Sequence, residues 1–362
     1  MKRVQDQDSV FLSRSARTRS ERRKKKRTQG IVVSVVVVLL VAVLSAGYVL
    51  FDLQRQFNTK SNTVTLGFSD AEQEARPIKD PENKSMNVLL LGVDHADEST
   101  SGSDALDEAV SQRSDSMMLV HIPEDRSQVY VMSMVRDMYV AIPGFGMNKL
   151  NAAISLGGVP LLLQTIEGLF ETKLDHVVMV DFEGFRELST ALGGVTVKND
   201  IPFTANDTDY YYPAGDITLE GDRALRFVRE RKSFTNGDYQ RVANQRKFIA
   251  AAANQMLSSE TLANPIKLYD IIDKVSPYLT FDEDFDASTL VGLGLQLKDV
   301  DTQNMEMFTM PTAGTSTSAD GQSIELASEL AISQISEALQ DDAMADYLQE
   351  NPPETPLVPD VG

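Results

Sequence analysis

The run NVLLLGV at residues 87–93, closed by Asp94, decides the fold of this chain. Seven largely apolar residues in a row are typical of a strand that is buried on both faces of a sheet, which requires a covering layer on each side. Two more strand patterns follow at 116–122 and 128–134, separated by the turn sequence PEDRS. Beyond them helix and strand patterns alternate, which predicts an α/β fold with helices covering a central sheet.

An antiparallel meander of these three strands has a geometric consequence. The end of the first strand, the start of the second and the end of the third would meet at one edge, bringing together Asp94, Asp115 and Arg136. Two carboxylates and an arginine at strand ends suit a site for Mg²⁺ and a phosphate group, because Mg²⁺ is commonly held by carboxylates plus phosphate oxygens. Ordinary turn and capping chemistry is the alternative for both aspartates.

The stretch LRFVRERKSFTNGDYQRVANQRK at 225–247 carries the densest polar pattern of the chain. Arg229 and Arg231 are two apart, so their side chains share a side only if the backbone there is extended. A turn signal with a helix N-cap follows, and a helical pattern then puts Arg241 and Gln245 on one face near the positive end of a helix. This combination predicts a phosphate-binding site, with a set of solvated surface charges as the alternative.

Charge and hydropathy mark two segments that precede this domain in the sequence. Residues 1–30 hold eleven Lys/Arg against three acidic residues, a net charge of +8 out of a total of −19, which leaves −27 for the rest. The uncharged run at 31–51 has 21 residues, close to the roughly 20 that span a bilayer as a helix. It is longer than a signal-peptide core and lacks a good cleavage site, so we expect an uncleaved transmembrane anchor. The preceding basic cluster predicts a cytoplasmic N-terminus and an extracellular domain in the plasma membrane.

The remaining patterns complete the predicted organisation. We expect a polar extracellular stalk at 52–85, whose one strand pattern is a weak alternation around 64–66, a catalytic domain at 86–342 and a disordered proline-rich tail at 343–362. Strands are predicted at 177–182, 195–197 and 305–310, and helices at 148–156, 159–170, 183–192, 244–257, 263–275, 287–297 and 324–339. The chain has no cysteine and three histidines, which excludes disulfides and thiolate metal sites and leaves little room for a His-rich metal site. Nucleotide P-loop, dinucleotide, HExxH and GxSxG motifs are absent.

Six segments in order resemble the LytR–CpsA–Psr family of cell-wall glycopolymer transferases. They are LLLGVD (89–94), RSDSMMLV (113–120), SMVRDMYVAIPGFGMNKLNAA (133–153), DFEGFRELSTALGGVTV (181–197), LEGDRALRFVRER (219–231) and GDYQRVANQR (237–246). The resemblance implies an α/β/α sandwich around a central mixed sheet, preceded by one transmembrane helix, with an apolar pocket for a polyprenyl chain.

The resemblance also implies roles for individual residues. Asp94 and Asp115 match the acidic metal positions, which implies Mg²⁺ or Mn²⁺ as cofactor. The positions that match groups holding the lipid pyrophosphate are Arg113, Arg136, Lys149, Arg229, Arg231, Asp238, Arg241 and Gln245. One departure stands out: this chain has Asn244 where the family often has Arg. The cationic contact that this Arg would make is therefore either lost in this chain or supplied by Arg246 or Arg241.

The implied reaction moves a glycopolymer from an undecaprenyl-diphosphate-linked donor to a hydroxyl of peptidoglycan and forms a phosphodiester. Asp115 would take the acceptor proton, while Arg136, Arg229 and Arg231 would stabilise the phosphate oxygens. Two alternatives stay open. A membrane-anchored pyrophosphatase would use the same residues with water as acceptor. An envelope-linked transcriptional regulator would use the basic tail, but the position of this tail against the membrane and the lack of a helix-turn-helix pattern argue against nucleic acid as a partner.

Overall fold

The computed structural model describes residues 52, 55–93, 114–206, 208–235, 237–256, 258–262, 264–297 and 305–353. All the elements below belong to one compact unit that starts at Gln56. The predicted cytoplasmic tail (1–30) and transmembrane anchor (31–51) lie outside the described residues, as do Asp94 and Arg113.

A mixed seven-stranded sheet forms the centre of the domain. Its strands, in spatial order, are β1 (Asn62–Val64), β12 (Leu279–Asp282), β7 (His176–Asp181), β2 (Met86–Val93), β3 (Ser114–Ile122), β4 (Val129–Met134) and β13 (Met305–Thr309). The pairs β1–β12, β7–β2 and β4–β13 are parallel, and the other neighbours are antiparallel. The predicted antiparallel meander of β2, β3 and β4 is therefore confirmed.

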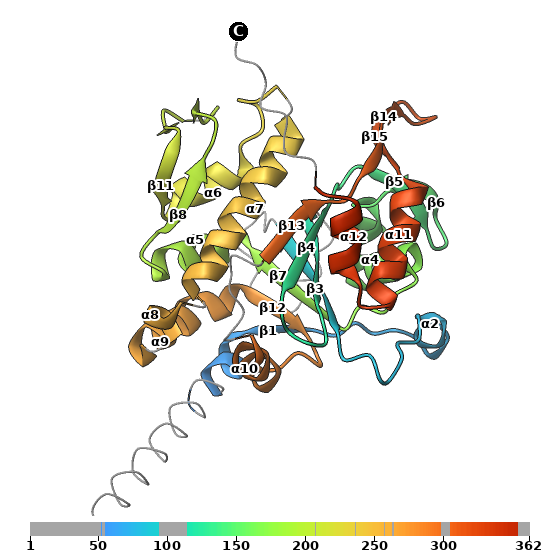
Figure 1. Cartoon of the computed structure of the whole chain (residues 1–362), viewed down its shortest axis with the longest axis horizontal. Helices are drawn as coiled ribbons and strands as arrows, with labels where there is room; N and C mark the ends of the chain where they lie inside the picture. The colour runs from blue at the N-terminus through green and yellow to red at the C-terminus, as the bar shows by residue number, and fades with distance from the viewer. Residues whose placement is uncertain are drawn as a thin grey trace, which may run out of the picture. The chain divides into compact units, whose positions relative to one another are not determined.

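Helices cover both faces of this sheet, because its strands alternate apolar side chains between two cores (Figure 1). In β3, Met117 and Leu119 face the larger core, whereas Met118 and Ile122 face the smaller one. The larger core is closed by α4 (Ala152–Phe170), α11 (Glu329–Gln340) and α12 (Met344–Glu350). The smaller core is closed by α7 (Gly237–Met256) and α10 (Ala287–Gln296). The predicted helix–sheet–helix layering is thus observed.

Helix α4 belongs to the domain interior, although among the described residues it alone is long and apolar enough to cross a membrane. Just over half of its most apolar window is buried, with Leu162 and Ile166 fully enclosed. Gly157 and Gly158 leave the helical conformation, and Gly158 has φ 67° and ψ −163°, which only glycine adopts readily. The predicted break at 157–158 is therefore confirmed.

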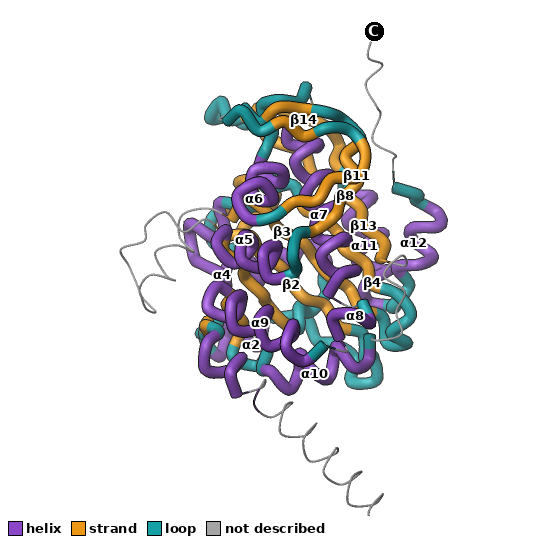
Figure 2. Tube along the Cα trace, turned by 90° about the vertical axis from the view of Figure 1, so that its left-hand side faces the viewer, coloured by secondary structure: helices purple, strands orange, loops and turns teal. Residues whose placement is uncertain are grey.

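Smaller sheets and the remaining helices surround this core. A four-stranded sheet contains β14 (Thr312–Thr317), β15 (Ser323–Ala327), β5 (Met138–Ile142) and β6 (Gly146–Lys149). Two-stranded pairs join β8 (Val195–Asn199) to β11 (Gly215–Leu219) and β9 (Phe203–Thr204) to β10 (Tyr211–Tyr212). The other helices are α2 (Asp70–Ala75), α5 (Phe182–Ala191), α6 (Gly221–Arg229), α8 (Ser259–Leu262) and α9 (Pro265–Val275). Figures 1 and 2 both place α6 and β14 at one end of the domain and α2, α9 and α10 at the other.

The expectation of a polar stalk at 52–85 is wrong, because this segment packs on the domain. Strand β1 adds to the central sheet through β12, and Phe57 is buried against Phe281. Farther along, both Nε and Nη2 of Arg76 donate to the buried carboxylate of Glu167, with an Nη2–Oε1 distance of 2.7 Å. A three-residue strand held by a partner more than 200 positions away leaves almost no local pattern to read.

Three predicted boundaries near the site and the C-terminus also need correction. Asn148 and Lys149 lie in β6, and the helix expected from 148 begins at Ala152. The helix expected from 324 begins at Glu329, because residues 323–327 form β15, which pairs with β14 and β5. The tail expected to be disordered from 343 starts with α12, whose Met344, Tyr347 and Leu348 fill the larger core. Residues 354–362 lie outside the described part.

A buried carboxylate ties the end of β12 to the start of β7. Asp282 is 2% exposed and accepts hydrogen bonds from the Val177 backbone N–H (2.7 Å) and from His176 Nδ1 (3.2 Å). Burial alone would raise the pKa of Asp282, but these donors together hold its pKa below the ordinary value. Because the folded pKa is lowered, the contribution to stability is complete at neutral pH and is lost as the pH falls below about 4.

We expect Asp282→Asn to lower the free energy of unfolding at pH 7 by about 2–3 kcal/mol, since it weakens a charge-assisted buried network. The deficit should shrink as the pH falls from 5 to 3, because the Asp282 carboxyl takes up a proton in the unfolded wild-type chain at a higher pH than in the folded one, as measured by urea unfolding at each pH. Asp270→Asn, at an exposed ion pair with Lys274, is the matched control and should change stability little. A deficit that stays constant down to pH 3 would contradict the assignment.

Candidate active site at the sheet edge

Four strands end at the edge of the sheet where β3 begins. The register pairs Val93 of β2 with Ser114 of β3 and also with Asp181 of the parallel strand β7. Met134 of β4 lies opposite Met117, and β13 runs parallel to β4 and ends beside it. The loops and helices that leave these strands therefore meet at one edge, which is where open α/β sheets present their ligand-binding residues.

Asp115 lies at a β-bulge on this edge. Gly92 of β2 pairs with Ser116, and the next residue, Val93, pairs with Ser114, so Asp115 is the additional residue of β3. Bulges are frequent beside active sites, because they change the direction of a side chain without ending the strand. In the sequence Asp94 directly follows Val93, so the prediction that Asp94 and Asp115 form one metal site agrees with the register of β2 and β3 up to Val93.

The metal site itself stays a prediction. The side chains of Asp94 and Asp115 are outside the described part of the chain. Within the described ranges, no three His, Asp or Glu side chains are grouped as metal ligands. Mg²⁺ usually takes only one or two protein carboxylates and completes its shell with phosphate oxygens and water, so the predicted pair of aspartates would be enough for this ion.

Arg136 and Lys149 lie on either side of a carboxylate that sequence reasoning missed. Asp137 Oδ1 is 3.0 Å from Lys149 Nζ, and Asp137 Oδ2 is 3.5 Å from Arg136 Nε. The pairing joins the turn after β4 to β6, and both cationic side chains keep about a fifth of their surface exposed. The one sequence feature that could have indicated a role for Asp137 in the site is its position next to Arg136 in VRDM. The structure thus brings together two of the predicted phosphate ligands through this carboxylate.

Arg229 and Arg231 line one cleft of about 310 Å³. Arg229 is the last residue of α6, and Glu230 then leaves the helix with φ −65° and ψ 129°. The predicted extended backbone is therefore correct only after Arg229. The guanidinium carbon of Arg229 is 4.2 Å from the ring centroid of Phe182, the residue that follows the end of β7. This contact puts Arg229 at the sheet edge described above.

Glu230 holds the turn that connects the two arginines. It is 7% exposed, and its carboxylate accepts the backbone N–H groups of Asn206 (2.8 Å) and Ser233 (3.0 Å). Burial opposes its ionisation, but these N–H groups and that of Lys232 keep the pKa of Glu230 below its ordinary value. The carboxylate is therefore charged at neutral pH and engaged by backbone donors. No pattern in the sequence pointed to this role.

Helix α7 docks on the end of α6 through two adjacent amides. Asn244 Nδ2 donates to the carbonyl of Phe227 (3.4 Å), and Gln245 Nε2 donates to that of Val228 (3.3 Å). Both carbonyls belong to the last turn of α6, where no intrahelical N–H remains to satisfy them. Ser116 Oγ in turn donates to Gln245 Oε1 (3.3 Å), which links the same helix to β3 beside the bulge.

This docking explains the departure at Asn244. The residue is 1% exposed and caps α6, so an arginine there would have no room in this packing. Arg246 does not replace the missing cation, since its Nη1 donates to Met307 of β13 (3.2 Å) and burial lowers its pKa. Arg241 is 5% exposed and lies one turn before Gln245 on the same face of α7. Arg241 is therefore the residue of α7 that provides the cationic side chain on the predicted face.

The N-terminus of α7 presses against Arg231. A Cβ atom on Gly237 would come within 2.7 Å of the Arg231 carbonyl oxygen, so only glycine allows this approach. The 20-residue helix thereby directs its positive end toward the arginine segment, where an anion would be favoured. Asp238 lies in the first turn of α7 rather than at its N-cap, and its side chain is outside the described part.

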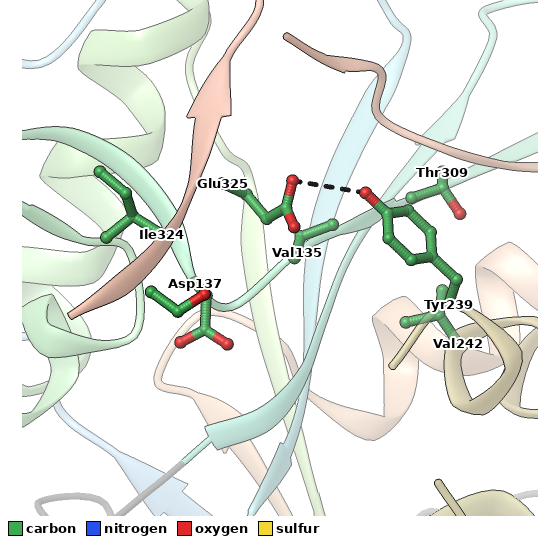
Figure 3. Close-up of a pocket in the computed structure, with 8 residues that line it drawn as sticks. Val135, Asp137, Tyr239, Val242, Thr309, Ile324 and Glu325 are labelled. Atoms are coloured by element: carbon green, nitrogen blue, oxygen red, sulfur yellow. Dashed lines mark hydrogen bonds between the residues drawn. The ribbon is translucent and has the colours of Figure 1, made fainter. Parts of the chain in front are cut away.

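A pocket of about 60 Å³ lies between α7 and the C-terminal strands (Figure 3). Tyr239 of α7 reaches across it, and its hydroxyl donates to Glu325 Oε2 of β15 at 3.4 Å. Val135 and Asp137 from the end of β4 form the facing wall. The segment after Pro311, to which sequence reasoning assigned no role, therefore contributes to the surroundings of the site.

We expect Asn244→Ala to lower the free energy of unfolding by about 1–3 kcal/mol, because it leaves the buried Phe227 carbonyl without its donor. Gln240→Ala removes only the hydrogen bond from Gln240 to Asn244 and serves as the control, with an expected loss of about 0.5–1 kcal/mol. Denaturant unfolding of the two variants provides the comparison. Equal losses would show that the amide does not cap α6.

These features define an α/β domain with an arginine-lined cleft at the edge of its sheet. A family model described as the LytR_cpsA_psr family matches residues 53–341, and the chain belongs to this family. The match starts well before residue 86, which agrees with the packing of the expected stalk onto the domain.

Named relatives and a solved structure agree with this membership. The chain is 36% identical over 197 residues to a polyisoprenyl-teichoic acid–peptidoglycan teichoic acid transferase TagU of Oceanobacillus iheyensis, covering 53% of this chain and 58% of the relative. It is 32% identical over 256 residues to TagU of Enterococcus faecalis, covering 70% and 78%. The crystal structure of B. subtilis TagV has a similar fold, with a TM-score of 0.60 and 22% identity over 73% of this chain and 98% of that one.

Proposed function

We propose that this protein transfers a glycopolymer from a polyprenyl-diphosphate-linked donor to a hydroxyl group of peptidoglycan. The relatives named as teichoic acid transferases support this class of reaction. The observation that carries the proposal is the position of the Arg229–Arg231 cleft beside the strand ends that carry positions 94 and 115. A diphosphate requires several fixed cations, and arginine supplies planar pairs of N–H donors that suit phosphate oxygens.

The reaction exchanges one bond to phosphorus for another. An acceptor oxygen of peptidoglycan attacks the phosphorus attached to the polymer sugar, and the bond from that phosphorus to the bridging oxygen breaks. The lipid monophosphate leaves with the bonding electron pair, and the product is a phosphodiester. The acceptor hydroxyl loses its proton to a carboxylate, for which we propose Asp115. Arg229 and Arg231 stabilise the charge that accumulates on the leaving phosphate.

The segment after β4 and strand β6 present a second pair of cations, Arg136 and Lys149. Asp137 lies between Arg136 and Lys149, so both side chains are held in place before a substrate arrives. Pre-organised donors cost no rearrangement when negative charge develops, which is why such pairs favour a transition state over a ground state. We assign Arg136 to the transferring phosphate and Lys149 to the outer part of the same group.

We further propose that Asp94 and Asp115 hold Mg²⁺ or Mn²⁺. The β-bulge supports this pair, because it lies where β2 ends and the next residue is Asp94. When bound, the ion would supply positive charge to the phosphate oxygens, in addition to that of the arginines.

Purified full-length chain, supplied with a lipid-linked donor and peptidoglycan fragments, should give a phosphodiester-linked product that mass spectrometry detects. Arg229→Ala should lower kcat/KM by about 10²–10³-fold, as expected for a donor to the developing charge. Asp115→Ala should lower it by about 10²–10⁴-fold through loss of the base. Lys274→Ala, on the surface of α9, is the control.

Product analysis decides between transfer and hydrolysis. A pyrophosphatase would release the same lipid monophosphate with or without peptidoglycan, and no joined product would form. Unchanged rates in both Arg229→Ala and Asp115→Ala would show that the site assignment is wrong.

We propose a single-pass topology with the N-terminus in the cytoplasm and the domain outside the plasma membrane, since the donor lipid and peptidoglycan are accessible there. The basic segment at 1–30 and the apolar run at 31–51 support this orientation. A phosphatase reporter fused after residue 353 should be active only if the domain is exported. Activity of a cytoplasmic reporter at the same position would overturn the proposal.

A further inference from the structure

Helix α9 lies beside the first residues of the domain. Gln56 Nε2 donates to the Tyr269 hydroxyl, and the Lys60 ammonium pairs with Asp273. Both contacts join residues that are 213 positions apart, so the segment from Gln56 to Lys60 runs alongside α9 in the same direction. Followed backward from Lys60 to Gln56, the chain therefore heads toward the N-terminal end of α9.

This end of α9 presents apolar surface to the outside of the domain. Ile266 is 82% exposed, and Tyr269, one turn farther along the same side of the helix, is 43% exposed. A single exposed apolar residue is ordinary on a protein surface and does not by itself indicate a partner. An aliphatic side chain beside a tyrosine is, however, the combination that suits the boundary between lipid headgroups and acyl chains.

The predicted anchor limits what this end of α9 can face. The apolar run ends at residue 51, five positions before Gln56. Five residues span at most about 18 Å, even when they are fully extended. Phe57 is 3% exposed and packs on Phe281, so the chain belongs to the core of the domain from this point onward. Under the proposed topology Gln56, and with it the end of α9 that it contacts, therefore lies close to the membrane surface.

The charge of α9 does not oppose contact with anionic lipids. Its eleven residues include two lysines and two aspartates, so the helix is neutral, whereas the chain beyond residue 30 carries −27. Lys267 follows Ile266, and its Nζ is 3.9 Å from Glu260 Oε1, which is longer than a hydrogen bond. The ammonium group therefore keeps N–H donors for a lipid phosphate, and anionic headgroups attract a lysine near the membrane surface.

We propose that the N-terminal end of α9 docks on the outer surface of the phospholipid bilayer that holds the anchor. Ile266 enters the boundary between headgroups and acyl chains, Tyr269 lies at the level of the headgroups, and Lys267 binds a lipid phosphate. A contact of this size would not hold a free domain, but the anchor keeps it at a high local concentration beside the bilayer. The inference rests on the proposed topology and goes beyond the transfer reaction, because it fixes which part of the domain contacts lipid.

A single introduced tryptophan tests this contact, because the chain contains none. Full-length Ile266→Trp is incorporated into vesicles of phosphatidylcholine and phosphatidylglycerol, with or without bromine atoms on the upper part of the acyl chains. Bromine should reduce its fluorescence at least about twofold, since side chains at an interface lie about 5–10 Å deep. Leu330→Trp on α11 is the matched control, because Leu330 is also highly exposed (71%), and its fluorescence should change little. Equal quenching of the two variants, or no quenching of Ile266→Trp, would overturn the proposal.

Charge reversal separates contact at this end of α9 from closeness of the domain in general. Added to Ile266→Trp, Lys267→Glu should lower the quenching about twofold, because a carboxylate is repelled by anionic headgroups. Lys274→Glu makes the same charge change in the last turn of α9 and should leave the quenching as it was. Equal losses in the two variants would contradict docking through the N-terminal end of the helix.

Flotation of the same vesicles tests the anchor separately. A chain that floats with the vesicles but shows no quenching in Ile266→Trp overturns the α9 surface and leaves the anchor, whereas a chain that does not float overturns both. Neither measurement needs turnover. Absence of transfer by the wild-type chain would therefore contradict the proposed function, and the quenching result would still decide whether α9 docks on lipid.

Discussion

The candidate site depends on the joint between the end of α6 and the side of α7. Asn244 and Gln245 satisfy the last carbonyls of α6, and Gln245 also meets Ser116 beside the β-bulge. Arg229 is carried by α6, Arg241 by α7 and Asp115 by β3, so this joint sets the position of all three elements relative to one another. These two amides are only two residues of the chain, yet they determine where the cationic groups can contact a phosphate.

Carboxylates around the site serve to arrange cations, which explains how an acidic chain maintains a positive cleft. Asp137 holds Arg136 and Lys149, Asp222 holds Arg226, and Glu230 is satisfied by backbone N–H groups. Asp137 and Asp222 form charge-assisted contacts with their cationic partners, and such contacts fix the geometry of the paired side chains. The net charge of the chain would indicate repulsion of anions, whereas the cations gathered at this cleft give it a local positive charge.

The reliable sequence predictions concern long elements with a strong apolar pattern. The strands β2, β3 and β4 and the break at Gly157–Gly158 follow from local pattern, and the meander then brings the ends of β2 and β4 and the start of β3 to one edge. The errors concern short or mixed elements. Strand β1 and helix α12 are only three and seven residues long, and each is stable only because other elements of the domain cover it.

The sequence by itself determined the α/β layering, the family, the arginine-rich stretch and the residues that resemble a diphosphate site, since these depend on local periodicity and on residue identity. Only the tertiary structure decided that Asp115 lies at a bulge and that Arg246 contacts β13. It also decided that Asp137 holds Lys149 and that Glu230 holds the turn between Arg229 and Arg231. Those facts depend on contacts between residues far apart in the chain. The spacing along one segment fixes which side chains share a face, but not which other segment that face will meet.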